Sequence, residues 1–218
     1  MTAMTKEELN AMPIEFKLNG RDVVGQASET IIQTARRYGI EIPRLCYKEG
    51  MRPDGNCRAC MVEIKGERVL APSCCRKPAP GMEVMTNNER SLASQKMVLE
   101  LLLSDMPKQR YTLNSELDFW ARKLKVGKPR FSPRHQPKAD LSHYGIAVDL
   151  DSCIQCTRCV RACREEQVND VIGYAFRGEH SKIVFDLDDP MGDSTCVACG
   201  ECVQACPTGA LIDRKSVV

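Results

Sequence analysis

The sequence predicts an α+β protein with two cysteine-rich domains and a connector between them. The thirteen cysteines form one group at positions 46–75 and another at 153–206. Within the second group a motif of four cysteines occurs twice, which indicates an internal repeat. Strand and helix patterns flank both groups. We therefore expect an N-terminal tail at 1–12, a first domain at 13–87, a helix and a basic, proline-rich connector at 88–144, and a second domain at 145–214.

The composition is that of an ordinary globular protein and excludes several classes. Hydrophobic residues make up 43% and charged residues 28% of the chain, so disorder is not expected. No apolar stretch reaches the roughly 18 residues of a membrane-spanning helix, and no signal-peptide pattern is visible. The net charge of +2 gives no general affinity for nucleic acid. Because cytosolic thiols stay reduced, clustered cysteines indicate metal ligation, and we expect a cytoplasmic protein without membrane insertion.

Local patterns assign the elements of the first domain. An alternating pattern at 14–24, broken by Asn19-Gly20, predicts a β-hairpin. Apolar residues at helical spacing over 31–38 predict a helix, with Ser28 as its N-cap and Gly39 as its stop. Further strands are expected at 61–64, 68–71 and 82–85.

The connector is expected to begin as a helix and then become irregular. Asn87 or Asn88 caps the predicted helix, which runs through Ser104. Residues 105–144 are rich in proline, lysine and arginine and contain the only tryptophan, Trp120. We interpret this stretch as a surface connector rather than an anion or nucleic-acid site, because no nucleic-acid module signature accompanies the charge. Short strands of the second domain are expected at 146–150, 183–187 and 210–212.

The second cysteine group has the spacing of iron–sulfur ligands. Cys-x2-Cys-x2-Cys-x3-Cys occurs at 153–163 and again at 196–206. Three thiolates spaced in this way converge on one cluster, and in two-cluster ferredoxins the fourth binds the other cluster. The repeat resembles bacterial 8-iron ferredoxins. Pro207, which follows the second copy of the motif, matches that family, whereas Arg164, which follows the first copy, does not. We assign one [4Fe–4S] cluster to Cys153, Cys156, Cys159 and Cys206, and the other to Cys163, Cys196, Cys199 and Cys202.

Structural zinc is the alternative for these cysteines. Structural zinc sites commonly use two Cys-x2-Cys pairs, which supply four ligands in tetrahedral geometry. Here three cysteines follow one another at this spacing, in two copies, and they do not divide naturally into such sets of four. The spacing therefore disfavours zinc. A c-type haem is excluded because no Cys-x2-Cys is followed by histidine.

The first cysteine group reads Cys-x10-Cys-x2-Cys-x13-Cys. Plant-type [2Fe–2S] ferredoxins likewise use one cysteine, a close pair and a remote fourth, with a shorter first interval. After a hairpin and a helix, the pattern resembles a β-grasp [2Fe–2S] ferredoxin-like domain, of the kind that begins the large iron–sulfur subunit of respiratory complex I. The resemblance implies that Cys75 is a buried spare thiol and that one [2Fe–2S] cluster is bound by Cys46, Cys57, Cys60 and Cys74.

Histidine ligands are not expected. Complex I continues from this region into a cluster that is held by one histidine and three cysteines, but this chain has no cysteine between Cys75 and Cys153. We therefore expect His135 and His143 to be surface or packing residues, and His180 has no evident partner.

The sequence around the cysteines carries a narrower resemblance. Residues 55–64 (GNCRACMVEI), 71–76 (APSCCR), 153–163 and 196–210 look like the N-terminal iron–sulfur region of the α subunit of NAD-dependent, molybdenum- or tungsten-containing formate dehydrogenases. The similarity runs from about residue 13 to 212, so the chain is either a separate small subunit or a piece of a longer one.

That resemblance implies an electron-transfer function. Electrons would leave formate at a Mo/W-bis-pterin centre on a formate dehydrogenase catalytic subunit or domain, and pass through this chain to an FMN-containing, NADH-oxidising subunit. We expect no substrate active site within the chain, because it has no Gly-x-Gly-x-x-Gly motif and no nucleophile–base pair. The alternative is an electron-relay subunit of an NAD-reducing hydrogenase or complex I-like enzyme.

Charges near the motifs predict unequal reduction potentials. Arg158, Arg161 and Arg164 surround the first motif, whereas Glu201 lies in the second. Positive charge favours the more negative, reduced cluster, so we expect a higher potential at the first centre. Because metal binding contributes folding free energy, we also expect the metal-free second domain to be largely unfolded.

Overall fold

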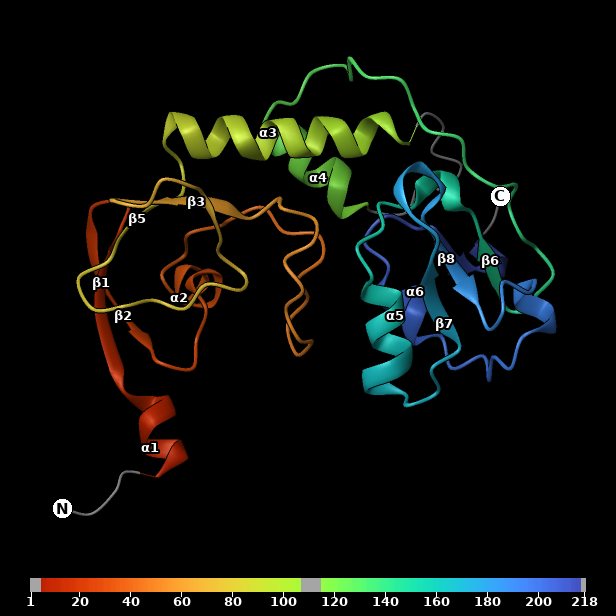
Figure 1. Ribbon diagram of the computed structural model, residues 1–218, viewed down its shortest axis with the longest axis horizontal. Helices are drawn as coiled ribbons and strands as arrows, with labels where there is room; N and C mark the ends of the chain where they lie inside the picture. Colours follow the sequence, from red (N-terminus) through yellow and green to blue (C-terminus); the bar gives the residue numbers. More distant parts are fainter. Residues whose placement is uncertain (1–4, 107–114, 217–218) are drawn as a thin grey trace. The chain divides into compact units, whose positions relative to one another are not determined.

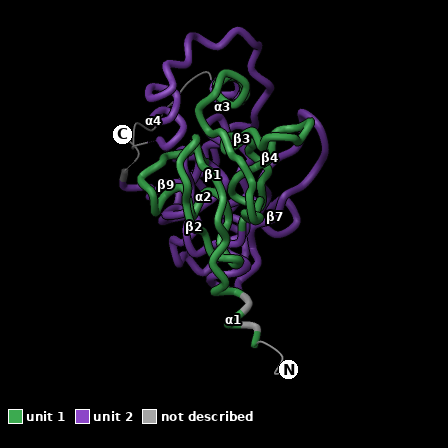
Figure 2. The backbone as a smooth tube through the Cα atoms, turned by 90° about the vertical axis from the view of Figure 1, so that its left-hand side faces the viewer, with its two compact units in different colours: residues 1–44, 53–98 green, residues 45–52, 99–218 purple. Residues whose placement is uncertain are grey.

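The computed structural model describes residues 5–106 and 115–216. Positions 1–4 of the predicted tail and 107–114 of the predicted connector lie outside the described residues. The chain divides into two compact units (Figure 2): unit 1 comprises Met1–Arg44 and Pro53–Val98, and unit 2 comprises Leu45–Arg52 and Leu99–Val218. Both units combine helices with sheets, which confirms the predicted α+β class.

Unit 1 is built on a five-stranded mixed sheet in the order β2-β1-β5-β3-β4, four strands of which, β1, β2, β3 and β5, are labelled in Figure 1. The strands β1 and β5 are parallel, and the other neighbours are antiparallel. Such a mixed sheet with one helix packed on it is the expected β-grasp arrangement. The strands are β1 (Pro13–Leu18), β2 (Arg21–Gln26), β3 (Met61–Ile64), β4 (Ala71–Pro72) and β5 (Glu83–Met85).

The predicted hairpin is confirmed by β1 and β2. Asn19 and Gly20 between them have φ values of 51° and 80°, which is the geometry that a two-residue hairpin turn requires. Phe16 and Leu18 on β1 are buried, whereas Glu15 and Lys17 are exposed, so the alternation in the sequence corresponds to the two faces of a sheet.

The strand expected at 68–71 is wrong, because β4 is limited to Ala71–Pro72. The Arg68 carbonyl accepts a hydrogen bond from the Arg90 side chain, and Val69 is 56% exposed. The chain therefore does not pair with β3 directly after the turn that follows β3, and its pairing with β3 begins only at Ala71, opposite Val62.

Helix α2 (Ile31–Arg37) contributes buried Ile31, Ile32 and Ala35 to the core of unit 1. It begins after Thr30 and not, as expected, after Ser28. The Thr30 amide donates to Gln33 Oε1 at 2.8 Å, which is one half of a capping box.

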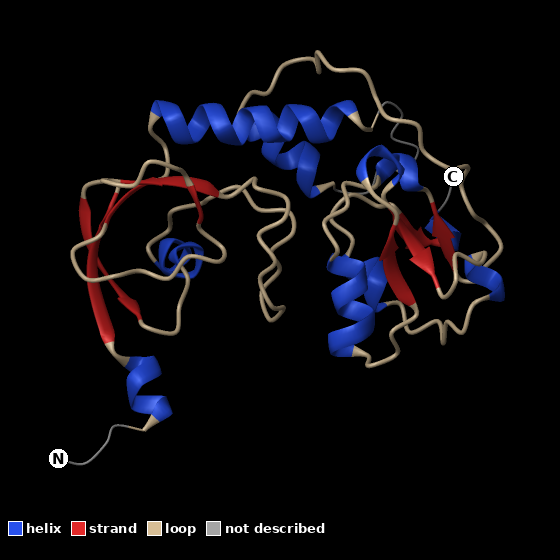
Figure 3. Cartoon of the chain, viewed as in Figure 1, coloured by secondary structure: helices blue, strands red, loops and turns tan. Residues whose placement is uncertain are grey.

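The connector is more ordered than the sequence predicted. Helix α3 (Glu89–Ser104) is confirmed, with Asn88 Oδ1 accepting from the Ser91 amide at 3.0 Å. A second helix, α4 (Glu116–Lys123), was not expected. It is capped by Ser115 and buries Leu117 and Trp120, so this part of the stretch is not a surface connector. The chain that follows α4 is loop until β6 (Figure 3).

Unit 2 contains two small antiparallel sheets, β6 with β9 and β7 with β8. Two short helices, α5 and α6, pack against each other and follow the first cysteines of each motif. The expected strands are confirmed within one or two residues, and β7 was missed because Gly173 interrupts its pattern. The elements are β6 (Ile146–Val148), α5 (Arg158–Arg161), a π-helical turn (Ala162–Glu166), β7 (Ile172–Ala175), β8 (Lys182–Phe185), α6 (Glu201–Ala205) and β9 (Leu211–Asp213).

The remaining helices are short. They are α1 (Lys6–Ala11) and 3-10 turns at Leu150–Ser152, Gly178–His180, Met191–Asp193 and Arg214–Ser216. None of the helices in the described ranges has the length and apolar character of a membrane span.

Candidate metal centres

Four cysteines of unit 2 line one apolar cavity. Cys153, Cys156 and Cys159 come from the first motif, and Cys206 comes from the end of the second. The structure thus brings together residues that the sequence assigned to one cluster, although Cys206 is distant in the chain. The other walls are largely apolar, with Leu150, Ile154, Ile183, Ala210 and Leu211.

The cavity disfavours free thiolates. Burial, together with the neighbouring Cys206, raises the pKa of Cys153 to about 11. Burial and neighbouring thiols also raise the pKa of Cys156 and of Cys159 far above the ordinary value. Metal centres bind deprotonated cysteines, so four thiols in one apolar cavity fit a multi-atom cluster that disperses their charge.

The second predicted set is also brought together. Burial and the nearby thiols of Cys196, Cys199 and Cys163 raise the pKa of Cys202 to about 12. The pKa of Cys196 is raised by burial first, and then by Cys199 and Cys163. Cys163 and Cys202 are buried and Cys196 is half-buried, but Cys199 is exposed.

The two motif loops share one backbone conformation. In the first loop Gln155 has a φ of 55° and its amide donates to Cys153 Sγ at 3.4 Å. In the second loop Ala198 has a φ of 57° and its amide donates to Cys196 Sγ, also at 3.4 Å. The sequence repeat is therefore a structural repeat, in which a left-handed residue directs an N–H group at a ligand sulfur.

The four predicted [2Fe–2S] ligands belong to both units. Cys57, Cys60 and Cys74 belong to unit 1, whereas Cys46 lies in the segment of unit 2 that spans 45–52. All are buried except Cys57, which is half-buried. Within unit 1 the Ser73 hydroxyl donates to the Cys60 carbonyl at 2.8 Å and fixes the loop before Cys74. Their assignment to one cluster stays a prediction.

The expectation that Cys75 is buried was wrong. Its side chain is exposed, and its Sγ lies 3.6 Å from that of Cys74. The amides of Cys75 and Arg76 both donate to the Pro72 carbonyl, so the chain turns here. Within this turn Cys74 points inward and Cys75 points outward.

The three arginines of the first motif differ in environment. Arg158 and Arg161 are each 3% exposed, whereas Arg164 is exposed and pairs with Asp170 at 2.6 Å. Water screens an exposed pair, so Arg164 contributes little to the field at a buried centre. Sequence position alone did not distinguish the environments of these three residues.

His135 and His143 occupy the surface and packing positions that were expected, whereas His180, which had no evident partner in the sequence, lies 3.6 Å from Glu179. His143 is 3% exposed, and its Nδ1 accepts hydrogen bonds from the amides of Gly145 and Ile146. His135 and His180 are exposed. Across the described residues, no three His, Cys, Asp or Glu side chains are grouped to hold a single metal ion.

Two family matches define the class of protein. Residues 11–89 match the 2Fe-2S iron-sulfur cluster binding domain, and residues 152–210 match the 4Fe-4S dicluster domain. The chain is therefore an iron–sulfur protein with a [2Fe–2S] domain followed by a domain for two [4Fe–4S] clusters. These domains contain all twelve predicted ligands.

The chain is similar in sequence to subunits or segments of several oxidoreductases. A subunit of an NADP-reducing hydrogenase from Solidesulfovibrio fructosivorans is 34% identical over 94% of this chain. A subunit of an NADH-quinone oxidoreductase from Rhizobium meliloti is 32% identical over 91%, and a putative formate dehydrogenase from Staphylococcus haemolyticus is 29% identical over 90%. The chain spans 37%, 24% and 20% of these three proteins, respectively.

A solved structure matches in fold as well. A chain in the crystal structure of an NAD+-reducing [NiFe]-hydrogenase superposes with a TM-score of 0.84 and 26% identity, covering 92% of this chain and 87% of that one. The chain is therefore similar over most of its length to a hydrogenase subunit, to an NADH-quinone oxidoreductase subunit and to the solved hydrogenase chain.

Proposed function

We propose that the chain is the iron–sulfur electron-transfer subunit, or segment, of an NAD-dependent formate dehydrogenase. The main support for an electron-transfer role is the cavity of unit 2, which is lined by four cysteine thiols from the two motifs and by apolar side chains. The sequence resemblance around the cysteines and the putative formate dehydrogenase among its relatives favour formate as the source of electrons.

In this proposal the cysteines hold three clusters in the sets expected from the sequence. Cys46, Cys57, Cys60 and Cys74 hold the [2Fe–2S] cluster, and the two sets of unit 2 hold the [4Fe–4S] clusters. When bound, such clusters accept and release single electrons. The chain contributes the thiolates, the N–H groups of Gln155 and Ala198 that point at sulfur, and the apolar walls that exclude water.

The proposed partners carry the remaining chemistry. A Mo/W-bis-pterin centre on a catalytic subunit or domain would oxidise formate, and an FMN-containing subunit would reduce NAD⁺. We also propose the domain limits 13–87 and 145–214, separated by the connector, and a cytoplasmic location.

An NAD-reducing hydrogenase is the second candidate. The solved chain from such an enzyme is covered over 87% of its length, whereas only 20% of the putative formate dehydrogenase is covered. A subunit of this size therefore has a precedent in a hydrogenase complex.

Co-purification from the native host distinguishes the two candidates. A tagged chain is isolated under exclusion of oxygen, its partner polypeptides are identified, and NAD⁺ reduction is assayed with formate and with hydrogen. Formate-dependent reduction supports the proposal, whereas hydrogen-dependent reduction alone supports the hydrogenase and overturns it.

Iron and acid-labile sulfide test the clusters themselves. One [2Fe–2S] and two [4Fe–4S] clusters require about ten irons and ten sulfides per chain. Zinc without sulfide would identify a structural zinc module and contradict an electron-transfer function.

A further inference from the structure

Two buried arginines of α5 hold the segment that carries Cys46. Arg158 Nη1 donates to the Leu45 carbonyl at 3.1 Å, and Arg161 Nη2 donates to the Cys46 carbonyl at 2.6 Å. The segment 45–52 belongs to unit 2 by its contacts, although the sequence placed it in the first domain.

Arg161 contacts cysteines that are assigned to two different clusters. The same Nη2 that donates to the Cys46 carbonyl also donates to the Cys156 carbonyl at 3.3 Å, and Nη1 donates to the Arg52 carbonyl. Cys46 and Cys156 are far apart in the sequence, and one guanidinium fixes the backbone of both.

The charge of this guanidinium acts in a buried environment. Arg161 is 3% exposed, and a charge acts more strongly where water does not screen it. Reduction of an iron–sulfur centre adds negative charge, which a buried cation nearby stabilises. Charge near a cluster is one means by which a protein sets its potential, and Arg161 supplies a positive charge. Its hydrogen bonds to the carbonyls of Cys46 and Cys156 fix the backbones of these predicted ligands.

We propose that Arg161 is a positioning residue shared by two clusters, which fixes the ligand backbones of Cys46 and Cys156 and raises the reduction potential of both centres. This proposal rests on the proposed electron-transfer function. The affected step is the uptake of one electron by each centre, and Arg161 itself is neither oxidised nor reduced.

The neighbouring arginines differ in ways that make them useful controls. Glu116 offsets the charge of Arg158, with both carboxylate oxygens 2.9 Å from Nη1. Arg164 lies three residues after Arg161, is exposed, and pairs with Asp170. A substitution of Arg164 therefore removes the same formal charge from an exposed site.

Other contacts hold the segment 45–52 when Arg161 is changed. Met51 packs with Ala162 and Ala205, and Lys48 Nζ donates to the Gln204 carbonyl at 3.3 Å. Arg52 pairs with Glu165 at 3.2 Å. A conservative substitution at Arg161 thus leaves several independent anchors in place.

The test is an EPR-monitored redox titration of the whole chain with its clusters, using dithionite and mediators. We expect Arg161→Gln to move the midpoint potentials of the [2Fe–2S] centre and of one [4Fe–4S] centre to more negative values. The other [4Fe–4S] centre should move less, and Arg164→Gln should move none of the three. Arg161→Lys should largely restore both potentials because it keeps the charge.

A second variant, Arg161→Lys, keeps the proposal testable if Arg161→Gln loses its clusters. Lys presents a point charge rather than a planar fork, so Arg161→Lys should alter the EPR line shape of the [2Fe–2S] centre even where potentials are restored. Unchanged potentials in Arg161→Gln with full iron content, equal shifts in Arg164→Gln, or an unaltered line shape in Arg161→Lys would each overturn the proposal. If the unmodified chain lacks [2Fe–2S] and [4Fe–4S] signals, the proposed function itself fails.

Discussion

Individual residues shape the cysteine loops through left-handed backbone. Position 198 is Ala with a φ of 57°, and position 200 is Gly with a φ of 82°, so the same loop holds one strained and one unstrained residue. An alanine at positive φ lacks the freedom of glycine and destabilises the fold, because its Cβ approaches the backbone.

Substitutions at these two positions should have opposite effects. Ala198→Gly removes the Cβ and should stabilise the holoprotein by about 0.5–1 kcal/mol, whereas Gly200→Ala should destabilise it by about 1 kcal/mol. The measurement is the temperature at which the cluster absorbance is lost. A change of the same sign in both variants would contradict this account of the loop.

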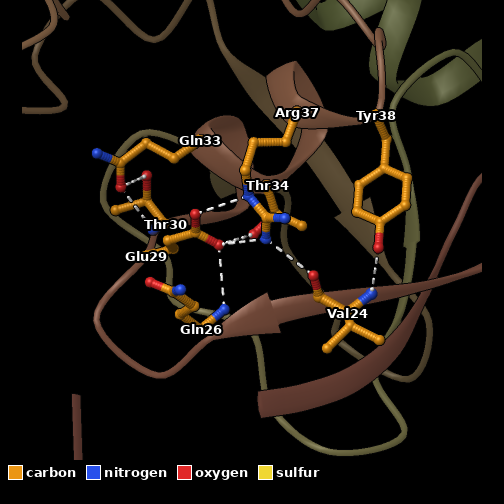
Figure 4. Close-up of polar contacts among 8 residues, drawn as sticks. All are labelled: Val24, Gln26, Glu29, Thr30, Gln33, Thr34, Arg37 and Tyr38. Atoms are coloured by element: carbon orange, nitrogen blue, oxygen red, sulfur yellow. Dashed lines mark hydrogen bonds and ion pairs between the residues drawn. The ribbon is translucent and has the colours of Figure 1, made fainter. Parts of the chain in front are cut away.

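A polar network in unit 1 links α2 to β2 (Figure 4). Arg37 donates to both carboxylate oxygens of Glu29, at 2.8 and 2.7 Å, and to the Val24 carbonyl at 2.8 Å. The Gln26 amide and the Thr34 hydroxyl also donate to Glu29. Burial alone raises the pKa of the Glu29 carboxyl, but these hydrogen bonds, led by that of Arg37, hold the pKa below its usual value.

The lowered pKa of Glu29 predicts a pH-dependent contribution to stability. The contribution is fully present above the unfolded pKa of about 4.3 and is lost as the pH falls through the lower folded pKa. Because Arg37 is 48% exposed, we expect Glu29→Gln to cost only about 1 kcal/mol at pH 7. The loss of stability in Glu29→Gln is measured by far-UV circular dichroism during thermal unfolding at pH 7, 5 and 4. The difference from the unmodified protein should shrink at the lowest pH; a constant difference would show that the carboxylate charge is not the cause.

At the scale of elements, strong local signals predicted the structure well. The hairpin turn at Asn19-Gly20, the helix α3 and the strand β3 are specified by turn chemistry and periodicity. Helix α4 was missed because its eight residues lie in a proline-rich stretch, and burial of Trp120 stabilises it in the folded chain. Short elements depend on packing, which a local pattern does not contain.

The two cysteine loops of unit 2 differ in exposure, and this predicts unequal stability of their clusters. Cys199 is exposed and Cys196 half-buried, whereas Cys156 and Cys159 of the first loop are buried. We expect an iron chelator to remove the cluster of the second loop first. EPR of samples taken during chelation measures the order of loss, and simultaneous loss of both [4Fe–4S] signals would contradict the prediction.

At the scale of the whole molecule, the two units have different cores. The main core of unit 2 contains Cys159, Cys163 and Cys202, with Cys153, Cys196 and Cys206 packed against it. The sheet of unit 1 buries aliphatic and aromatic side chains, such as Phe16, Leu18 and Val84. We therefore expect unit 2 to lose stability without metal, because protonated thiols then take the place of metal-ligand bonds in its core.

Iron removal should consequently unfold the two units to different extents. In the metal-free chain we expect the amides of β6 and β9 to exchange with solvent rapidly, because metal-ligand bonds supply the folding free energy of this unit. The amides of β1 and β2 should remain protected. Hydrogen exchange with mass spectrometry measures both, and native protection of β6 and β9 without iron would refute the prediction.

The sequence by itself determined the number and spacing of the cysteines, and with them the domain order and the types of cluster that the family matches support. Ligand spacing is local information, because a loop of two residues between thiols has few conformations. The repeat of the motif also predicted that Cys206 joins Cys153, and the structure places both in one cavity. Only the tertiary structure turned Cys75 outward and buried Arg161 against the Cys46 carbonyl. These features depend on contacts between residues up to 115 positions apart, which no local pattern specifies.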